Sequence, residues 1–369
     1  MTPRRLLVAA LALLAAAALL LSFGEREPAP TERARVDFPT HMREPEAERS
    51  ERRATLTLPA PPPEAGQPAP APQPRDPFLV GLPVKPGEPI VVFEANALRH
   101  SRLGELFVGC VLARDPRAFS GIEDELGIDP LKDLDRVAFV GDAVVVSGFF
   151  DRFKPERLER DARPEPHGDA GQLWIPEPGP EGSAARTAFA LWKDQLLLAS
   201  TDPEDLRRAI DQLEGRAPVP DAGIPEDMAY GEVYGIIPGA AARRFFGSDA
   251  RGLGERLATV ASRIEVHADA TSDLAAVVRV RGEDAAGISD LARSLGAALS
   301  VARVEAQATD DRQFAELLES ARVVDGEGAL SLELAVPAER LEAWFQGCGP
   351  AHTAVAPAEG APGDGGPAR

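Results

Sequence analysis

Residues 127–151, GIDPLKDLDRVAFVGDAVVVSGFFD, contain two apolar runs that meet at Gly141 and Asp142. The runs RVAFV and AVVVSGFF are rich in β-branched and aromatic residues, which fit the pleated surface of a strand. A two-residue Gly-Asp connection is typical of the tight turns that join antiparallel strands. The stretch therefore predicts a β-hairpin.

Three aspartates, Asp129, Asp133 and Asp135, precede this hairpin and raise the question of a cation site. A calcium loop of the EF-hand type needs oxygen ligands at alternate positions and a glycine at the sixth, whereas this sequence places Pro130 second and Lys132 in the middle. Asp129 before Pro130 is typical of a helix N-cap, with Asp133 in the first turn near the positive end of the helix dipole. We interpret the aspartates as structural, and a surface cation is the alternative that stays open.

The same order of elements occurs twice between residues 89 and 348. Each half begins with a strand and a helix (PIVVFEA and MAYGEVYGII open the two halves), and two hairpin-plus-helix units follow. The predicted hairpin turns lie at Gly141-Asp142, Lys193-Asp194, Thr271 to Asp273 and Asp325-Gly326. The pattern predicts an α+β fold with an internal duplication: two similar lobes of antiparallel hairpins with helices on one face, residues 89–215 and 227–348, joined by a linker at 216–226.

Helix signals support this plan locally. In TDPEDLRRAIDQLEGR, Asp202 is a predicted N-cap with Pro203 at the first helical position. The apolar residues that follow at helical spacing predict one buried stripe: Leu206, Ala209, Ile210 and Leu213.

Residues 119–151 and 189–215 also carry a resemblance to a known family. FSGIEDELGIDPLKDLDRVAFVGDAVVVSGFFD followed by FALWKDQLLLASTDPEDLRRAIDQLEG is similar to exported bacterial proteins grouped as a domain family of unknown function. The resemblance extends loosely over residues 89–348. It implies a membrane-tethered, extracytoplasmic protein with a tandem α+β repeat, and it brings no catalytic motif.

The N-terminus contains an uncharged apolar run at residues 6–23, preceded by Arg4 and Arg5. A helix of this length just spans the hydrocarbon core of a bilayer, so residues 1–24 are predicted to be a membrane anchor or a signal. The positive-inside rule keeps the two arginines in the cytoplasm. We expect the N-terminus inside the inner (cytoplasmic) membrane and the main domain in the periplasm or outside the cell, or secreted if the segment is cleaved.

Two further segments have compositions that disfavour a packed core. Residues 25–88 are rich in proline, alanine and glutamate, and we predict a disordered, semi-stiff linker. Residues 349–369 are predicted to be a disordered tail for the same reason. The linker would hold the domain away from the membrane.

Charge and motif content exclude several functions. The chain has 369 residues and a formal net charge of −19, and no cluster of lysines and arginines suits it to nucleic acid. Nucleophile-elbow, phosphate-loop and zinc-protease motifs do not occur. We therefore predict no catalytic, cofactor-binding or metal site. The five histidines show no helical metal-ligand spacing: His41, His100, His167, His267 and His352.

Two cysteines occur in similar strings, FVGC and FQGC, each ending at the cysteine, Cys110 or Cys348. Each is predicted to lie just past a helix. In an oxidising compartment they form a possible disulfide if the end of the second lobe returns to the start of the first, and two buried thiols are the alternative. For the larger aromatic residues core packing is the default prediction, and an exposed subset that forms a partner surface is the alternative: Trp174, Trp192, Trp344, Phe149 and Phe345.

These features together predict a non-enzymatic, membrane-anchored cell-envelope protein that acts in binding or envelope structure. The expected partners are the inner membrane, through residues 6–23, and an envelope protein whose identity the sequence does not give. The alternatives are an envelope hydrolase whose residues converge only in three dimensions, around His100 or His267, and a small-ligand-binding protein with a site in the groove between the lobes.

Overall fold

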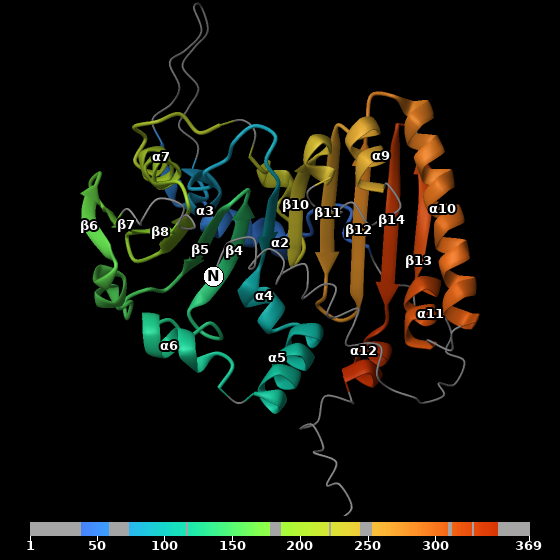
Figure 1. Ribbon diagram of the computed structural model, residues 1–369, viewed down its shortest axis with the longest axis horizontal. Helices are drawn as coiled ribbons and strands as arrows, with labels where there is room; N and C mark the ends of the chain where they lie inside the picture. The colour runs from blue at the N-terminus through green and yellow to red at the C-terminus, as the bar shows by residue number, and fades with distance from the viewer. Residues whose placement is uncertain are drawn as a thin grey trace, which may run out of the picture.

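The computed structural model describes residues 38–58, 74–115, 117–177, 186–220, 223–243, 253–308, 312–326 and 328–345. Its centre is a 12-stranded antiparallel sheet with the order β13-β14-β12-β11-β10-β3-β4-β5-β9-β8-β7-β6 (Figure 1). A small two-stranded sheet pairs β1 (Leu56–Thr57) with β2 (Pro74–Arg75). The α+β prediction with antiparallel hairpins is confirmed.

The strands of the large sheet are β3 (Ile90–Phe93), β4 (Leu134–Val140), β5 (Ala143–Gly148), β6 (Ala162–His167), β7 (Gly171–Pro176), β8 (Ala188–Trp192), β9 (Leu196–Ser200), β10 (Val233–Pro238), β11 (Arg263–Asp269), β12 (Leu274–Arg281), β13 (Ala321–Gly326) and β14 (Ala329–Val336). The α-helices are α2 (Glu44–Arg53), α3 (Pro77–Val80), α4 (Ala95–Arg99), α5 (Arg102–Arg114), α6 (Ser120–Leu126), α7 (Pro203–Leu213), α9 (Leu253–Val260), α10 (Ala285–Ala308), α11 (Arg312–Glu319) and α12 (Ala338–Phe345). The 3-10 helices are η1 (Pro155–Arg160), η2 (Glu226–Met228) and η3 (Gly239–Ala241).

The hairpin predicted around Gly141 and Asp142 forms. In the β4–β5 hairpin, Val140 pairs with Ala143 across the Gly141-Asp142 turn, and Gly141 has a φ of 54°. The β8–β9 hairpin turns at Lys193 and Asp194, both with φ of 51°, as a tight turn with left-handed central residues requires. The predicted turn at Asp325-Gly326 is displaced, because both residues belong to β13.

The two predicted lobes share one sheet. β3 pairs with β10, with Phe93 opposite Val233, so the first strands of the two halves join at the centre. Moving outward, β4, β5, β9 and β8 follow β3, and β11, β12, β14 and β13 follow β10; β6 and β7 extend the first half. The strands of both predicted lobes thus belong to one continuous sheet. An unpaired β3 or β10 would expose a row of backbone donors and acceptors.

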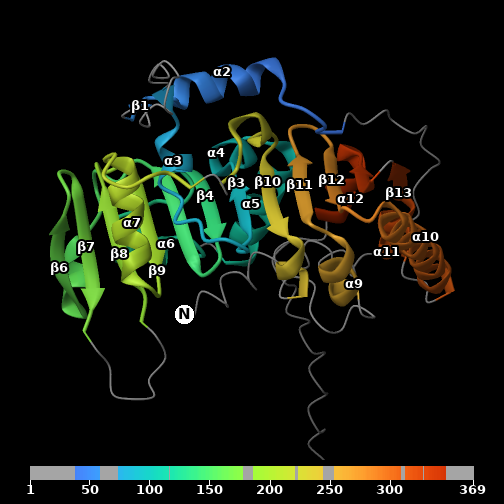
Figure 2. The same cartoon turned by 90° about the horizontal axis from the view of Figure 1, so that it is seen from above.

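Helices cover both faces of the sheet, not one. Leu196 and Leu198 of β9 pack in a core with residues of α3 and α7, whereas Leu197 between them packs in another core with Ile128 and Phe150. In the second half, Ile264 of β11 packs with residues of α9 and α10. Figure 2 shows α2 on one side of the sheet and α9 on the other.

The predicted disordered linker at 25–88 is a second correction. Residues 38–58 form α2 and β1, and residues 74–88 form β2, α3 and a loop that packs into the main core. Phe78, Val80 and Leu82 are at most 1% exposed. This part of the segment packs because it contains the short apolar string PFLVGLPV at 77–84. The proline-rich composition of the surrounding residues outweighed this string in the prediction.

Other predicted segments fall partly or wholly outside the described residues. The membrane anchor at 1–24 and the tail at 349–369 do so completely. Among the described residues, no helix is both long and apolar enough to cross a bilayer.

Candidate functional site

Asp129, Asp133 and Asp135 are held by donors of the protein itself. The segment after Asp129 is a turn, not the predicted helix, yet Asp129 Oδ1 still accepts a hydrogen bond of 2.9 Å from the Leu131 N–H. Asp133 Oδ2 accepts one of 2.7 Å from the Asp129 N–H. The Lys132 ammonium lies 2.6 Å from Asp129 Oδ2, and the hydrogen bond that it donates holds the pKa of Asp129 below its ordinary value. These contacts fit the structural interpretation.

The turn is positioned by the glycine that ends α6. Gly127 has a φ of 71°, and a Cβ at this position would lie 2.1 Å from the Arg152 carbonyl oxygen. Only glycine fits both the left-handed conformation and the close approach. Arg152, brought near in this way, donates hydrogen bonds of 3.1 and 3.2 Å to the two oxygens of Asp133.

Asp133 and Asp135 also line a cavity of about 350 Å³, which we call the Arg99 cavity. Its walls come from the end of α2, the start of α3, α4, the turn before β4, the end of β5 and the start of β9. Four cationic side chains line it: Arg53, Arg99, Lys132 and Arg136. Apolar lining is provided by Pro77, Phe78, Leu134, Phe149 and Leu196.

A buried ion pair forms part of the cavity floor. Arg136 donates hydrogen bonds of 2.5 and 3.0 Å to the two oxygens of Asp76, and both residues are 4% exposed. The Arg136 guanidinium lies 4.2 Å from the centre of the Phe78 ring, a cation–π contact. Burial acts to lower the pKa of Arg136, but the hydrogen bond and charge of Asp76 outweigh it and raise the pKa. Arg136 therefore stays charged.

Sequence reasoning missed Arg136, although a signal was present. In LDRVAFV, Arg136 is in register with Ala138 and Val140, which are almost fully buried. Residues two apart in a strand share a face. A charge on the apolar face of a strand therefore indicates a buried partner.

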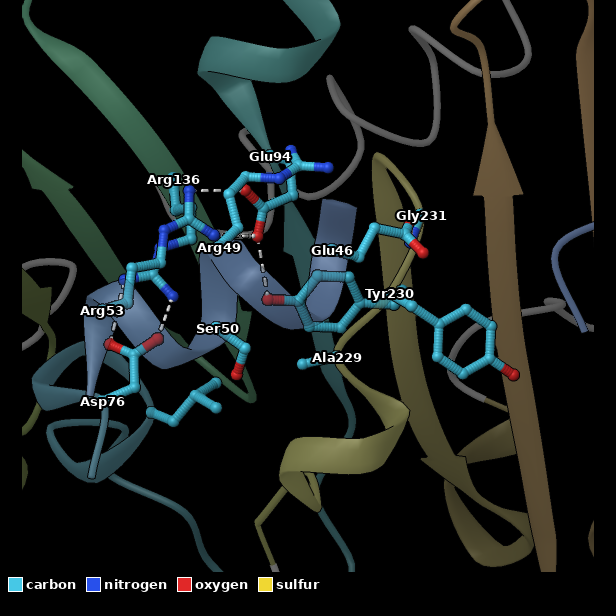
Figure 3. Close-up of a pocket in the computed structure, with 12 residues that line it drawn as sticks. Glu46, Arg49, Ser50, Arg53, Asp76, Glu94, Arg136, Ala229, Tyr230 and Gly231 are labelled. Atoms are coloured by element: carbon cyan, nitrogen blue, oxygen red, sulfur yellow. Dashed lines mark hydrogen bonds and ion pairs between the residues drawn. The ribbon is translucent and has the colours of Figure 1, made fainter. Parts of the chain in front are cut away.

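A second, much smaller cavity lies beneath α2, at the junction of the two halves (Figure 3). Arg53 of α2 donates hydrogen bonds of 3.1 and 2.9 Å to Glu94, and Glu94 also accepts one of 3.1 Å from the Tyr234 hydroxyl. This α2 cavity is about 20 Å³, room for about one water. The groove predicted between the lobes is thus filled here by α2 and its ion pairs.

Further along the same face, the start of α2 covers a group of buried acids. Arg43 lies 2.5 Å from Asp269, and Glu46 accepts a hydrogen bond of 2.9 Å from the Gly231 N–H. Burial and the neighbouring Asp269 raise the pKa of Glu232. Burial also acts to raise the pKa of Asp269, but hydrogen bonds from Thr271 and the charge of Arg43 hold it below its ordinary value.

The predicted histidines do not assemble a hydrolytic centre in the described part of the chain. The His100 ring contacts the Asn96 carbonyl oxygen at 2.7 Å, and the His267 ring contacts the Tyr230 carbonyl oxygen at 3.3 Å. In these hydrogen bonds the partner of each ring is a backbone carbonyl, not a serine hydroxyl or a carboxylate. His41, which contacts Thr40, and His167, which contacts Asp211, are not among the residues that line the Arg99 cavity. His352 is outside the described residues.

The predictions for Cys110 and for the aromatic residues are confirmed for some residues and wrong for others. Cys110 is buried inside α5, not past a helix as predicted, and Cys348 lies outside the described residues, so their pairing stays a prediction. Trp174 and Trp192 are buried as predicted, but Phe149 is 76% exposed, so the prediction of core packing is wrong for it. Phe345 is partly buried, and the Trp344 side chain is outside the described set.

Comparisons with known proteins give little further information. No family model and no curated protein matches the chain. One solved structure, described as crystal form I of TP0453, is similar over 73% of this chain and 96% of that chain, with 9% identity and a TM-score of 0.38. A similarity this distant carries no argument, and the resemblance to an exported family stays a prediction.

Proposed function

We propose that the protein is a non-enzymatic, membrane-anchored binding protein of the cell envelope, with the Arg99 cavity as its ligand site. The observation that carries the binding role is the cavity itself: about 350 Å³, bounded by both charged and apolar side chains. Ligand pockets typically have volumes of about 300 to 1,000 Å³ and combine apolar side chains with a few polar groups. This cavity has the volume of a small ligand pocket, with a more polar lining. Binding here would require no catalytic group.

The location rests on the sequence. The apolar run at 6–23 after Arg4 and Arg5 supports an anchor with a cytoplasmic N-terminus. The equal order of strands outward from β3 and from β10 supports an internal duplication, in which two copies of one unit joined through their first strands.

A protease experiment on intact spheroplasts tests the location. Added protease is expected to digest the region 89–348, whereas a cytoplasmic marker protein stays intact. If this region is degraded only after the membrane is lysed, the proposed topology is wrong.

Site-specific crosslinking in cells tests the binding role. A photoreactive amino acid replaces Gln195, an exposed residue that lines the cavity, or Arg293, an exposed residue of α10. The position-195 chain is expected to acquire defined mass adducts on illumination, and the position-293 chain is the matched control. Equal adduct patterns at both positions would contradict a ligand site in the cavity.

A further inference from the structure

The carboxylates that line the Arg99 cavity already have cationic partners. Asp76 is bonded to Arg136, Asp133 to Arg152, and Asp135 to Arg53, with nitrogen-to-oxygen distances of 2.5 to 3.1 Å. A bound cation would have to displace one of these pairs. The lining carboxylates therefore do not favour a cationic ligand.

Arg99 differs from the other cations of the cavity. Lys132 pairs with Asp129, and Arg53 and Arg136 pair with the acids above. Arg99 donates only to neutral oxygens in its recorded contacts: 2.8 Å to Asn96 Oδ1 and 3.4 Å to the Leu134 carbonyl. A guanidinium has five N–H donors in a planar fork that matches carboxylate or phosphate. Arg99 thus has donor capacity and charge that an anion can use.

Two residues that line the cavity each have a polar atom without a hydrogen-bond partner. These are Arg136 Nε and Ser147 Oγ, both shielded from solvent. Arg136 Nε lies 3.7 Å from Asp135 Oδ2, beyond hydrogen-bond distance. A buried polar atom without a partner is costly, and an Nε–H is satisfied only by an acceptor. Because neither atom is accessible to solvent, the solvent in the cavity included, a ligand there does not reach them, and the preference for an anion rests on Arg99.

Aromatic and aliphatic side chains complete the lining. Phe78 is 0% exposed and Leu196 is 2% exposed, whereas Phe149 at the rim is 76% exposed. Covering the apolar surface of an exposed phenylalanine beside a cavity with a ligand is favourable. The lining therefore suits an apolar body as well as an anionic head.

We propose that the Arg99 cavity binds a small organic anion, a carboxylate or a phosphate carried on an apolar body. Arg99 holds the anionic head, and Phe78, Leu196 and Phe149 contact the body. This inference rests on the proposed binding function and specifies the ligand class for the same cavity.

Equilibrium dialysis with the full chain in lipid discs tests the ligand class, with empty discs as the reference. The probes are octanoate, octyl phosphate, octanol and octyltrimethylammonium. We expect the two anions to bind more tightly than octanol and the cation, and the comparison of octanoate with octyl phosphate identifies the preferred head.

Two variants locate the site. Arg99→Gln is expected to weaken binding of the anions about tenfold, the loss of one charged hydrogen bond, and to leave octanol unchanged. Phe149→Ser is expected to weaken all probes that bind the wild type. Arg293→Gln, on α10, is the matched control and is expected to bind as the wild type does.

The outcomes separate the two proposals. If no probe binds and position 195 acquires no adducts, both the cavity site and its ligand class fail. If adducts form at position 195 but the cation binds best, or if Arg99→Gln binds octanoate as the wild type does, the binding site stands and the anionic ligand class is wrong.

Discussion

His267 is an ionisable residue in an environment that disfavours its charge. It is 2% exposed, its ring stacks on Tyr230 with the ring centres 4.0 Å apart, and its Nε2 has no hydrogen-bond partner. Burial lowers the pKa of His267 from its ordinary value of 6.5, and the charge of Arg279 acts in the same direction. The Tyr230 carbonyl and the acids Glu265 and Glu46 oppose this shift without reversing it.

His267 is therefore expected to make the folded state less stable in mild acid. As the pH falls through about 6.5, the unfolded chain takes up a proton that the folded chain does not, so the free energy of unfolding decreases. His267→Phe keeps the stack on Tyr230 and removes the titration. Urea unfolding between about pH 8 and about pH 5 should show a steeper loss for the wild type than for the variant.

The difference between the pH profiles of the wild type and His267→Phe separates the contribution of His267 to stability from those of the carboxylates. The pKa of Glu232 is raised, so its contribution to stability is lost as the pH rises, the opposite direction. The pKa values of Glu46 and Asp269 are lowered, so the stability that these two carboxylates contribute is lost only in stronger acid. His100→Gln, at an exposed histidine, is the control and should follow the wild type. Parallel pH profiles for wild type and His267→Phe would exclude this role.

At the scale of the element, α2 is a helix attached through charges. Its sequence, EPEAERSERR, has one apolar residue, Ala47, so a hydrophobic stripe cannot attach it to the sheet. Arg53 at its end bonds both Glu94 and Asp135, and the side chain of Glu94 is 5% exposed. Removing one partner leaves the other carboxylate buried without compensation.

Arg53 and its neighbour Arg52 provide a matched pair of substitutions. Arg53→Gln is expected to destabilise the protein by about 2 kcal/mol, below the usual cost of breaking a fully buried pair because Arg53 is partly exposed. Arg52 forms a surface pair with Glu48 within the helix, and Arg52→Gln is expected to cost less than about 0.5 kcal/mol. Urea unfolding measures both.

Hydrogen exchange identifies the part of the chain that the change affects. In Arg53→Gln, the amides of α2 should exchange faster, whereas those of α7, packed through Leu206 and Ile210, should keep their protection. Equal stabilities of the two variants would show that the Arg53 pairs do not hold α2 in place.

At the scale of the whole molecule, the end of the second half returns to the start of the first. α12 packs against α5, and Arg102 at the start of α5 bonds Glu342 of α12 at 2.5 and 2.8 Å. Cys110 lies in α5, and Cys348 follows α12 by a few residues. The end of the second half therefore lies beside α5 up to the last described residue, Phe345, and Cys348 is outside the described residues.

We expect Cys110 and Cys348 to pair in the exported protein. A bridge that closes a loop of more than two hundred residues stabilises by about 5 kcal/mol in the loop-entropy model. Under oxidising conditions, Cys110→Ser and Cys348→Ser should lose the same stability, and the double variant no more than either. Two thiols that react with an alkylating reagent in the unreduced, unfolded wild type would contradict the bridge.

Local signals account for the parts of the fold that the sequence predicts. The Gly141-Asp142 and Lys193-Asp194 turns, the alternating strands beside them and the cap of α7 at Asp202 depend on residues a few positions apart. Their conformations follow from backbone sterics and short hydrogen bonds. For this reason the hairpins and the α+β class could be predicted without coordinates.

The parts that were missed depend on residues far apart in the chain. Phe78 in a proline-rich segment becomes core only because β5, β9 and α7 offer it an apolar surface, and β3 and β10 join across 140 residues because each supplies the other's missing hydrogen bonds. The Arg99 cavity likewise exists only where six segments meet. The sequence by itself determined the β4–β5 and β8–β9 hairpins and the helix α7. Tertiary structure alone decided the single sheet and the cavity, because long-range pairing and burial are properties of surfaces that form only when the chain folds.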